Sequence, residues 1–448
     1  MIDSPTHAVL FGLDPLWTAT AILVLSYGVI MSDRINRAIV AMVGAAAMIL
    51  FQVIDQDRAI AGEDFNTLAL LTGMMLLVAQ ARRSGMFQAL AIWSAKAARG
   101  QPWAILALLT LVTALVSALL DNVTTVLLIA PVTLAITAEL KVPPYPFLFT
   151  EILASNIGGT ATLIGDPPNI IIGSAAGLTF NDFVVNLTPA ILVVLAMQML
   201  INHLIWGRRM QVGEQARARV MAMSPAEAIV DRRLLLQSVG VLALVILAFV
   251  LAHQIHLLPG TIALAGAGLL MLLDNVARSP EDQSHHVHAI FAEVEWITIF
   301  FFVGLFAIVA GVEDAGLLEM MASWLVDLTG GDLTVTAIAI LWGSALLSAI
   351  IDNIPFVATM IPVIKNMGPD FGGPQGLLPL WWSLSLGACL GGNGTLIGAS
   401  ANLTVAGIAE RAGVPFRFLT FLWLAFPMML MSVIVSTVYI YLRYLTGG

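Results

Sequence analysis

The stretch "SNIGGTATLIGDPPN", residues 155–169, interrupts a long apolar run with three glycines, two prolines, an aspartate and two asparagines. The chain around it is 59% hydrophobic and only 10% charged, so most of its surface must face lipid or other apolar segments. Unpaired backbone groups cannot face lipid, and irregular chain at membrane depth survives only where protein or a water-filled cavity satisfies it. We therefore predict that this stretch is the unwound middle of a membrane crossing and marks a binding site.

The composition also limits the chemistry of the chain. Its single cysteine, Cys389, excludes a disulfide framework within the chain and any multi-thiolate metal cage. No Walker-type phosphate loop occurs. The first apolar run follows no basic stretch, so we expect it to be a retained helix and not a cleaved secretory signal. We predict an integral membrane protein with no cofactor, no bound metal and no nucleic-acid partner.

Eight apolar runs are long enough to cross the hydrocarbon core of a bilayer. They lie near residues 17–32, 37–54, 66–81, 184–206, 234–252, 258–273, 295–312 and 418–445. Two longer tracts, 102–140 and 333–367, are broken centrally by "LLDNVTT" and "IIDNIPF", and we predict that each is a re-entrant hairpin with an Asp-Asn tip. The tracts 147–178 and 378–409 are interrupted by the first quoted stretch and by "LGGNGTLIGASAN". Each of these is predicted to be one discontinuous crossing.

The same order of elements occurs twice, as an internal repeat. A shift of 231 residues superposes Gly73 on Gly304, and a shift of 233 aligns the signature G-G-x-x-T-L-I-G-x-x-x-N at 158–169 with its copy at 391–402. Each copy holds five crossings, one of them discontinuous, and one re-entrant hairpin, and an odd number of crossings inverts the second copy. The predicted fold is therefore an all-α integral membrane protein of two inverted repeats and about ten transmembrane crossings. Its predicted parts are a first repeat at 1–206, a cytoplasmic linker at 207–233 and a second repeat at 234–448.

The basic residues predict the orientation of the chain. In the ten-crossing arrangement only Arg58, Lys365 and Arg443, of 19 lysines and arginines, fall on one side. By the positive-inside rule the other side is cytoplasmic. We therefore predict a multi-pass protein of the inner (plasma) membrane with both termini outside, and a second cytoplasmic loop at 274–294 that contains "SHHVH".

The breaks and hairpin tips carry the candidate chemistry. Secondary transporters are commonly built from inverted repeats whose broken helices hold the cargo and the coupling ion. Glycines let backbone approach a ligand closely, and Pro167 and Pro168 suit the first turn of the helix that restarts. We expect Asp121, Asp352 and Asp166 to bind a cation or carry a proton, since carboxylates within a membrane mark functional sites. The alternative is that each aspartate only caps the helix that follows it.

The other candidate residues for binding substrate or ions lie in the same tips and breaks. Their polar groups offer neutral hydrogen bonds, or alternatively satisfy only the broken backbone. They are Asn122, Thr124, Asn156, Gly158, Gly159, Thr160, Thr162, Asn169, Asn353, Gly391, Gly392, Asn393, Gly394, Thr395 and Asn402. By contrast, we expect Cys389 to be a packing residue and the histidines of "SHHVH" to be ordinary loop residues.

The motifs "SALLDNVTTVLLIAPVT" and "ASNIGGTATLIGDPPNIIIGS" resemble signatures of the ion transporter superfamily, in its arsenical pump and P-protein permease branch. The resemblance implies a transport domain, 102–206 with 333–446, that moves elevator-fashion against a scaffold, 17–100 with 234–330. It also implies a homodimer through the scaffold. Related dicarboxylate carriers have Ser-Asn-Thr at the hairpin tip, and the tips of this chain, Asp-Asn-Val at 121–123 and Asp-Asn-Ile at 352–354, depart from that pattern.

The leading functional hypothesis is efflux of arsenite or antimonite coupled to proton antiport. Arsenite is mostly an uncharged trihydroxy species near neutral pH and needs no cationic clamp. The segments 102–207 and 333–410 hold only Lys141 and Lys365 as basic residues, which fits a neutral cargo. A sodium/proton antiporter, an anion or carboxylate permease and a passive channel are the alternatives, and an accessory ATPase partner remains open. The chain is predicted not to be an enzyme, because the Tyr-Asp and Gly-x-Gly-Asp contexts of intramembrane aspartyl proteases are absent around Asp121 and Asp352.

Overall fold

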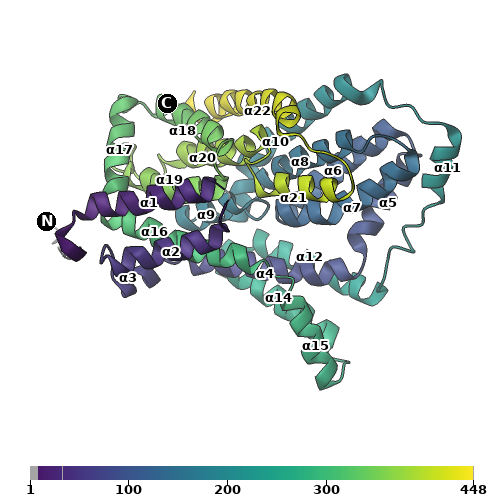
Figure 1. The fold of residues 1–448 in the computed structure, drawn as a ribbon, viewed down its shortest axis with the longest axis horizontal. Helices are drawn as coiled ribbons and strands as arrows, with labels where there is room; N and C mark the ends of the chain where they lie inside the picture. The colour runs from purple at the N-terminus through teal and green to yellow at the C-terminus, as the bar shows by residue number, and fades with distance from the viewer. Residues whose placement is uncertain (1–8, 33, 447–448) are drawn as a thin grey trace.

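The computed structural model describes residues 9–32 and 34–446, and every regular element among them is helical (Figure 1). The outermost residues of the two predicted repeats, 1–8 and 447–448, lie outside this description. A single 3-10 turn, Leu10–Gly12, precedes the first long helix. The helices of the first half are α1 (Pro15–Met31), α2 (Arg37–Leu50), α3 (Gln56–Ala61), α4 (Phe65–Arg83), α5 (Met86–Ala97), α6 (Pro102–Leu119), α7 (Asn122–Leu140), α8 (Tyr145–Thr160), α9 (Pro167–Ala176) and α10 (Phe180–Asn202), which a π-helical turn (His203–Gly207) extends.

The segment predicted as a linker, 207–233, contains a short helix, α11 (Glu214–Ala222). The second half repeats the order of the first, again with a π-helical turn (Tyr441–Leu445) after its last helix. Its helices are α12 (Arg232–Val250), α13 (Ala252–Ile255), α14 (Pro259–Asn275), α15 (Pro280–Phe291), α16 (Trp296–Asp314), α17 (Leu317–Leu328), α18 (Leu333–Ser348), α19 (Asn353–Asn366), α20 (Leu378–Gly391), α21 (Ser400–Arg411) and α22 (Phe418–Ile440), with a 3-10 turn (Gly392–Gly394) after α20.

The lengths and hydropathies of the helices are those of a multi-spanning membrane protein. Within the described residues, seven helices are long and apolar enough to cross a membrane, or up to eight if the bent pair α17 and α18 is one span. The seven include α6 and α7, which the sequence predicts to be hairpin arms, whereas α1 and α2 are shorter apolar helices. The all-helical membrane fold is confirmed, and the count of ten crossings stays a prediction.

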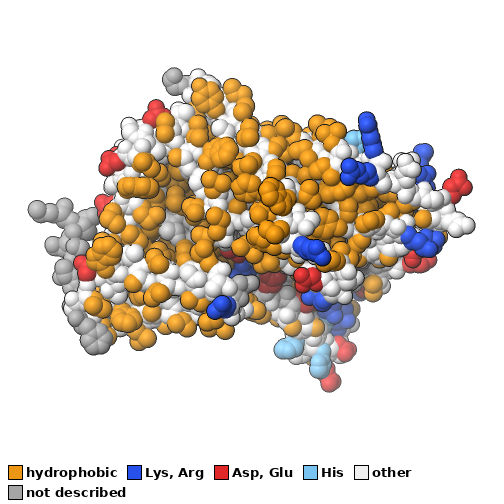
Figure 2. Space-filling view, turned by 45° about the horizontal axis from the view of Figure 1, so that its top comes forward, with side chains coloured by type: hydrophobic (Ala, Val, Ile, Leu, Met, Phe, Trp, Pro, Cys, Tyr) orange, Lys and Arg blue, Asp and Glu red, His pale blue; other side chains and the backbone are white. Residues whose placement is uncertain are grey.

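The surface agrees with a membrane environment. Figure 2 shows a broad hydrophobic face, with lysine and arginine side chains gathered toward the end of the molecule where α11 lies. Large apolar side chains on the outside include Leu192 and Trp423, which are 60% and 79% exposed. An exposed apolar surface of this extent suits contact with lipid.

Corresponding helices of the two halves pack in matching pairs. Helix α6 packs along α8, and α18 packs along α20 in the same way. By contrast, α2 and α4 of the first half pack against helices of the second half: α2 packs on α16, and α4 packs on α14. Both crossed pairs meet at a glycine: Gly304 lies against the backbone of Ala41, and Gly73 lies against the backbone of Ala263. The two halves are therefore interlocked and share one core.

The histidines of "SHHVH" are not in a loop, because residues 280–291 form helix α15. Ser279 caps this helix by accepting a hydrogen bond from the backbone N–H of Asp282, which is a start signal that the loop interpretation overlooked. His286 contacts the Asp274 carboxylate through Nε2 and Arg83 through Nδ1. The prediction of a loop was wrong here, although the segment still connects α14 to α16.

We predict that Gly304→Ala loosens the pairing of α2 with α16. A Cβ atom at this position would lie 2.4 Å from the backbone carbonyl carbon of Ala41, so the helices would have to separate. Overpacking of this kind costs about 1–3 kcal/mol, which thermal unfolding of the purified protein in detergent would measure. The control is Gly240→Ala in α12, where no atom lies within 4 Å of the added Cβ and stability should stay the same or rise. Equal effects of the two substitutions would contradict the close contact.

Candidate functional site

The two helix breaks nest against the two hairpins. A Cβ on Gly158 would lie 2.1 Å from the backbone oxygen of Ala114 in α6, and one on Gly391 would lie 2.5 Å from that of Ala345 in α18. Ser117 donates a hydrogen bond to the Ser155 carbonyl. Its counterpart in the second hairpin, Ser348, donates to the Ala388 carbonyl. Gly158 and Gly391, which were predicted to let a ligand approach the backbone, therefore lie against the hairpin arms. Because they have no side chain, the breaks and the arms can pack this closely.

Two asparagines satisfy the broken backbone. Asn169 donates hydrogen bonds to the carbonyl oxygens of Thr160 and Thr162, at 3.1 and 2.9 Å. Asn402 donates in the same way to two carbonyl oxygens of the second break, both at 2.8 Å. Ser385 donates to the side-chain oxygen of Asn169, so the first break is also tied to α20. For Asn169 and Asn402 the structure thus shows the backbone role that the sequence left open.

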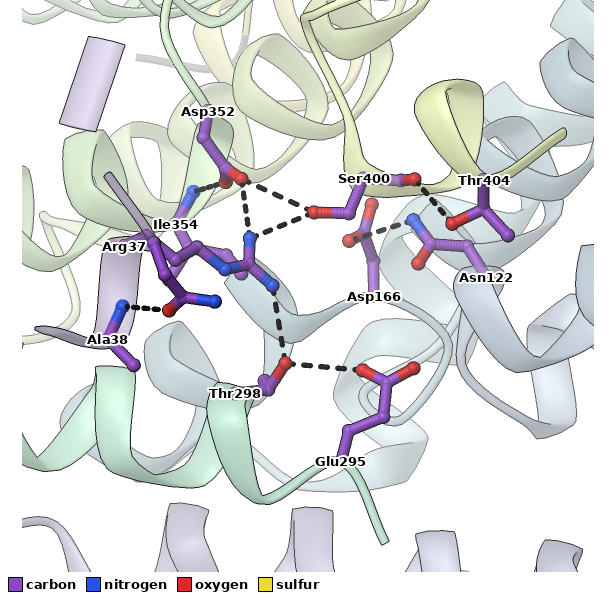
Figure 3. A network of polar contacts seen from close by, with 11 residues as sticks. Arg37, Ala38, Asn122, Asp166, Glu295, Thr298, Asp352, Ile354, Ser400 and Thr404 are labelled. Atoms are coloured by element: carbon purple, nitrogen blue, oxygen red, sulfur yellow. Dashed lines mark hydrogen bonds and ion pairs between the residues drawn. The ribbon is translucent and has the colours of Figure 1, made fainter. Parts of the chain in front are cut away.

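A second set of asparagines joins the halves. Asn156 donates hydrogen bonds to the side-chain oxygens of Asn393 and Asn402, each at 2.9 Å. It accepts one from Asn122 at the first hairpin tip, at 3.1 Å. Asn122 also donates to Asp166, at 3.3 Å. This buried network brings residues from both breaks and one tip to a single point, as drawn in part in Figure 3.

Asp166 is held differently from the other aspartates. Asp121 and Asp352 each cap the following helix, by accepting from the backbone N–H of Thr124 and of Ile354. Asp166 occupies the corresponding position before α9, but its side chain makes no cap hydrogen bond. Prolines, which have no N–H, fill the first two positions of that helix, and the N–H of Asn169 at the third donates to the backbone oxygen of Asp166. The Asp166 side chain is 1% exposed, one oxygen accepts from Asn122, and the other has no hydrogen-bond partner among the described residues.

Arg37 is the charged residue that the sequence interpretation missed. From the start of α2 its guanidinium donates hydrogen bonds to Asp352 and Ser400, both at 2.9 Å, and to Thr298 at 3.2 Å (Figure 3). It also lies 5.1 Å from the ring centroid of Phe301, a cation–π distance. The expectation of a site without a cationic group was therefore wrong. Arg37 lies at the start of α2, outside segments 102–207 and 333–410, and no local motif of the sequence links it to the tips and breaks.

These groups surround a small cavity of about 30 Å³, which is room for one or two water molecules. Residues from the hairpin tips and breaks form one wall, and residues from α2 and the start of α16 form the other. The polar lining consists of Asp121, Asn122, Asp166, Asn353, Ser400, Arg37, Glu295 and Thr298. Glu295 was also missed from the sequence, and it accepts a hydrogen bond from Thr298 at 3.2 Å.

Several predicted residues lie beside the cavity but do not line it. The hydroxyl of Thr124 donates to Asp121, and that of Thr160 donates to the Asn156 carbonyl. Thr162 and Thr395 donate to carbonyl oxygens at the ends of α6 and α18. Within the breaks, Gly159 packs against Gly165 and Gly392 against Gly398, whereas Gly394 packs against Ala349 at the end of α18. Cys389 is buried, and its thiol donates to Asn169 at 3.5 Å.

Two wider cavities lie toward opposite ends of α16. One, of about 280 Å³, is lined by Arg37, Asp352 and Ser400 together with the end of α1 and the tip of hairpin 333–367. The other, of about 290 Å³, is lined by Glu63, Glu313 and Lys365 and by parts of α9 and α19. Burial raises the pKa of Glu63, in the turn before α4, to about 7. The small cavity shares Arg37 and Ser400 with the first of these spaces, at the start of α16.

A buried cluster of carboxylates and amides between two broken helices is the construction of a membrane transporter. The sequence profile of the citrate transporter family matches residues 27–387, and the chain belongs to this family, within the ion transporter superfamily. An uncharacterized transporter of Mycobacterium tuberculosis is 45% identical over 430 residues, which are 95% of this chain and 98% of the relative.

The human P protein is 35% identical over 513 residues, which cover 96% of this chain and 60% of that protein. The predicted resemblance to the P-protein branch is confirmed by this match. The crystal structure of the Alcanivorax borkumensis YdaH transporter, whose topology is described as unusual, is similar in fold. Its TM-score is 0.62 over 96% of this chain and 98% of that chain, at 15% identity.

We predict that Asn169→Ala destabilises the first helix break. The substitution leaves the carbonyls of Thr160 and Thr162 without their partner, and each unsatisfied buried group costs about 1–3 kcal/mol. Thermal unfolding in detergent would measure the loss. Asn181→Ala is the control, because Asn181 makes an exposed hydrogen bond to the Val250 carbonyl, which water can replace. If the two variants unfold at the same temperature, Asn169 does not hold the break.

Proposed function

We propose that this protein is a secondary active transporter that couples proton movement to the passage of a small solute through the central cavity. The observation that carries the proposal is Asp166, a buried carboxylate that faces the cavity with one oxygen unpartnered among the described residues. Asp121 and Glu295 line the same cavity, and Arg37 is the cation beside them. Buried negative charge in excess of positive charge is unfavourable, so the cavity favours binding of a proton or a small cation.

The proposed architecture is that of two inverted repeats with ten crossings. The matching packing of α6 with α8 and of α18 with α20, and the crossed packing of α2 with α16 and of α14 with α4, support it. We further propose that the transport domain is 102–206 with 333–446 and the scaffold is 17–100 with 234–330. The position of the cavity supports this division, since Arg37 and Glu295 come from the scaffold and Asp121 and Asp166 from the transport domain.

The proposed motion is an elevator movement of the transport domain that connects the small cavity to each of the wider cavities in turn. The gathering of basic side chains at the α11 end supports a cytoplasmic location for that end, with both termini outside, in the plasma membrane (Figure 2). The resemblance to elevator transporters supports a homodimer through the scaffold.

Arsenite or antimonite is the proposed cargo, moved outward in exchange for protons. The amide and hydroxyl groups of the cavity, from Asn122, Thr298 and Ser400, support an uncharged trihydroxy species. A second candidate is a carboxylate anion. Arg37 favours it, because a guanidinium pairs well with carboxylates, and the name of the citrate transporter family points the same way.

We predict that Asp166→Asn abolishes transport coupled to the proton gradient. The amide has the size of the carboxyl group but cannot exchange a proton. The measurement is accumulation of arsenite, antimonite, citrate or sodium in everted membrane vesicles energised by respiration. The native protein should accumulate its cargo, and Asp166→Asn should fall to the level of vesicles without the protein. Asp370→Asn, which changes an exposed aspartate, is the matched control and should retain native transport.

The outcomes of this assay separate the proposals. Accumulation that survives both Asp166→Asn and collapse of the proton gradient would overturn proton coupling. Accumulation of citrate without arsenite would show that the cargo is a carboxylate anion and not arsenite. Accumulation of sodium alone would identify a sodium/proton antiporter.

A further inference from the structure

The two halves of the protein treat their carboxylates differently. In the first half, Asp166 has an oxygen with no hydrogen-bond partner among the described residues. In the second half, Asp352 forms an ion pair with Arg37 at 2.9 Å, and the two side chains are only 19% and 24% exposed. The residue that corresponds to Asp166 in the second break is Ala399, at the shift of 233 residues that relates the breaks.

Arg37 belongs to the first half and has no cationic counterpart in the second half. Gly304 contacts the backbone of Ala41, and Gly73 contacts the backbone of Ala263, so Ala41 and Ala263 are equivalent positions. Four residues before Ala41 is Arg37, and four residues before Ala263 is Pro259. The guanidinium is thus present only beside the carboxylate of the second half.

Arg37 fills the place that a bound cation would take. Its guanidinium contacts Asp352, Ser400 and Thr298, which come from the second hairpin tip, the start of α21 and α16. A guanidinium stays charged across the physiological pH range, so it neutralises Asp352 at every pH at which the transporter works. The other ionisable groups around the same cavity are Glu295 before α16 and Asp121 and Asp166 from the first half.

We propose that Arg37 acts as an internal cation. In this conformation its ion pair with Asp352 prevents transported cations from binding to that carboxylate. Asp166 then remains as the exchangeable site, because one of its oxygens has no partner among the described residues, whereas both oxygens of Asp121 accept from Thr124 and Glu295 accepts from Thr298. The inference rests on the proposed function, because it describes how many cations the same cavity exchanges. It also identifies Arg37 as the contact that must break when the transport domain moves, since α2 belongs to the proposed scaffold and Asp352 to the proposed transport domain.

The test counts cations bound by the purified protein in detergent. Two probes are used separately: proton uptake after a step from mildly alkaline to mildly acidic pH, and equilibrium binding of radioactive sodium. Arg37→Gln removes the internal cation and should add one proton or one sodium ion per chain. Asp352→Asn in the Arg37→Gln background should remove that additional cation, whereas Asp352→Asn alone should leave the native count unchanged.

Two further variants serve as controls. Arg37→Lys keeps a positive charge at the position and should retain the native count. Arg34→Gln changes an exposed arginine of the same segment and should also retain it. A folded Arg37→Gln protein with the native count would overturn the inference. If Arg37→Gln does not fold, the Arg37→Gln/Asp352→Asn protein, in which the carboxylate left without its cation is also removed, must fold and show the native count, and any other count overturns the inference.

The same measurement separates this inference from the proposed function. If Asp166→Asn removes one cation from the native count and Arg37→Gln adds none, the proposed function stands and the inference fails. If Asp166→Asn leaves the count unchanged, the proposed site itself is wrong.

Discussion

The backbone of a broken helix has to be satisfied inside the membrane, where an unpaired carbonyl costs several kcal/mol. In this protein one asparagine in each break does so: Asn169 and Asn402 each donate to two carbonyl oxygens of their own break. Serines of the hairpins, Ser117 and Ser348, donate to further carbonyls of α8 and α20. Because of these bonds each break lies against its hairpin, and the polar side chains of both halves meet at one point.

The site is asymmetric because a few of its residues differ between the two repeats. At the start of α9 two prolines lack an N–H and the N–H of Asn169 bonds to the Asp166 backbone, so the Asp166 side chain caps nothing and one of its oxygens has no partner among the described residues. The second break has Ala399 at this position, and an arginine satisfies the remaining aspartate of that half. Two copies of one framework therefore provide one unpaired and one paired carboxylate.

The cavity is a boundary between two groups of helices. Its aspartates and asparagines lie in the hairpins and breaks, while Arg37, Glu295 and Thr298 lie in α2 and around the start of α16. A movement between these groups changes which charges face each other, because the ion pair of Arg37 with Asp352 joins one group to the other. In the proposed elevator movement this contact would be made in one state and broken in the other, and it would couple the occupancy of the site to the position of the helices.

The sequence by itself determined the membrane class, the helical segments, both hairpins and both breaks, because hydropathy, glycine, proline and capping aspartates act over a few residues. It also identified Asp121, Asp166 and the asparagines of the tips and breaks as candidate site residues. Only the tertiary structure decided that Arg37 and Glu295 face them, that the glycines approach the hairpin arms, and that Asp166 leaves its helix uncapped. Those features depend on contacts between residues far apart in the chain, such as Arg37 and Asp352, and no local pattern encodes which distant helix will lie opposite.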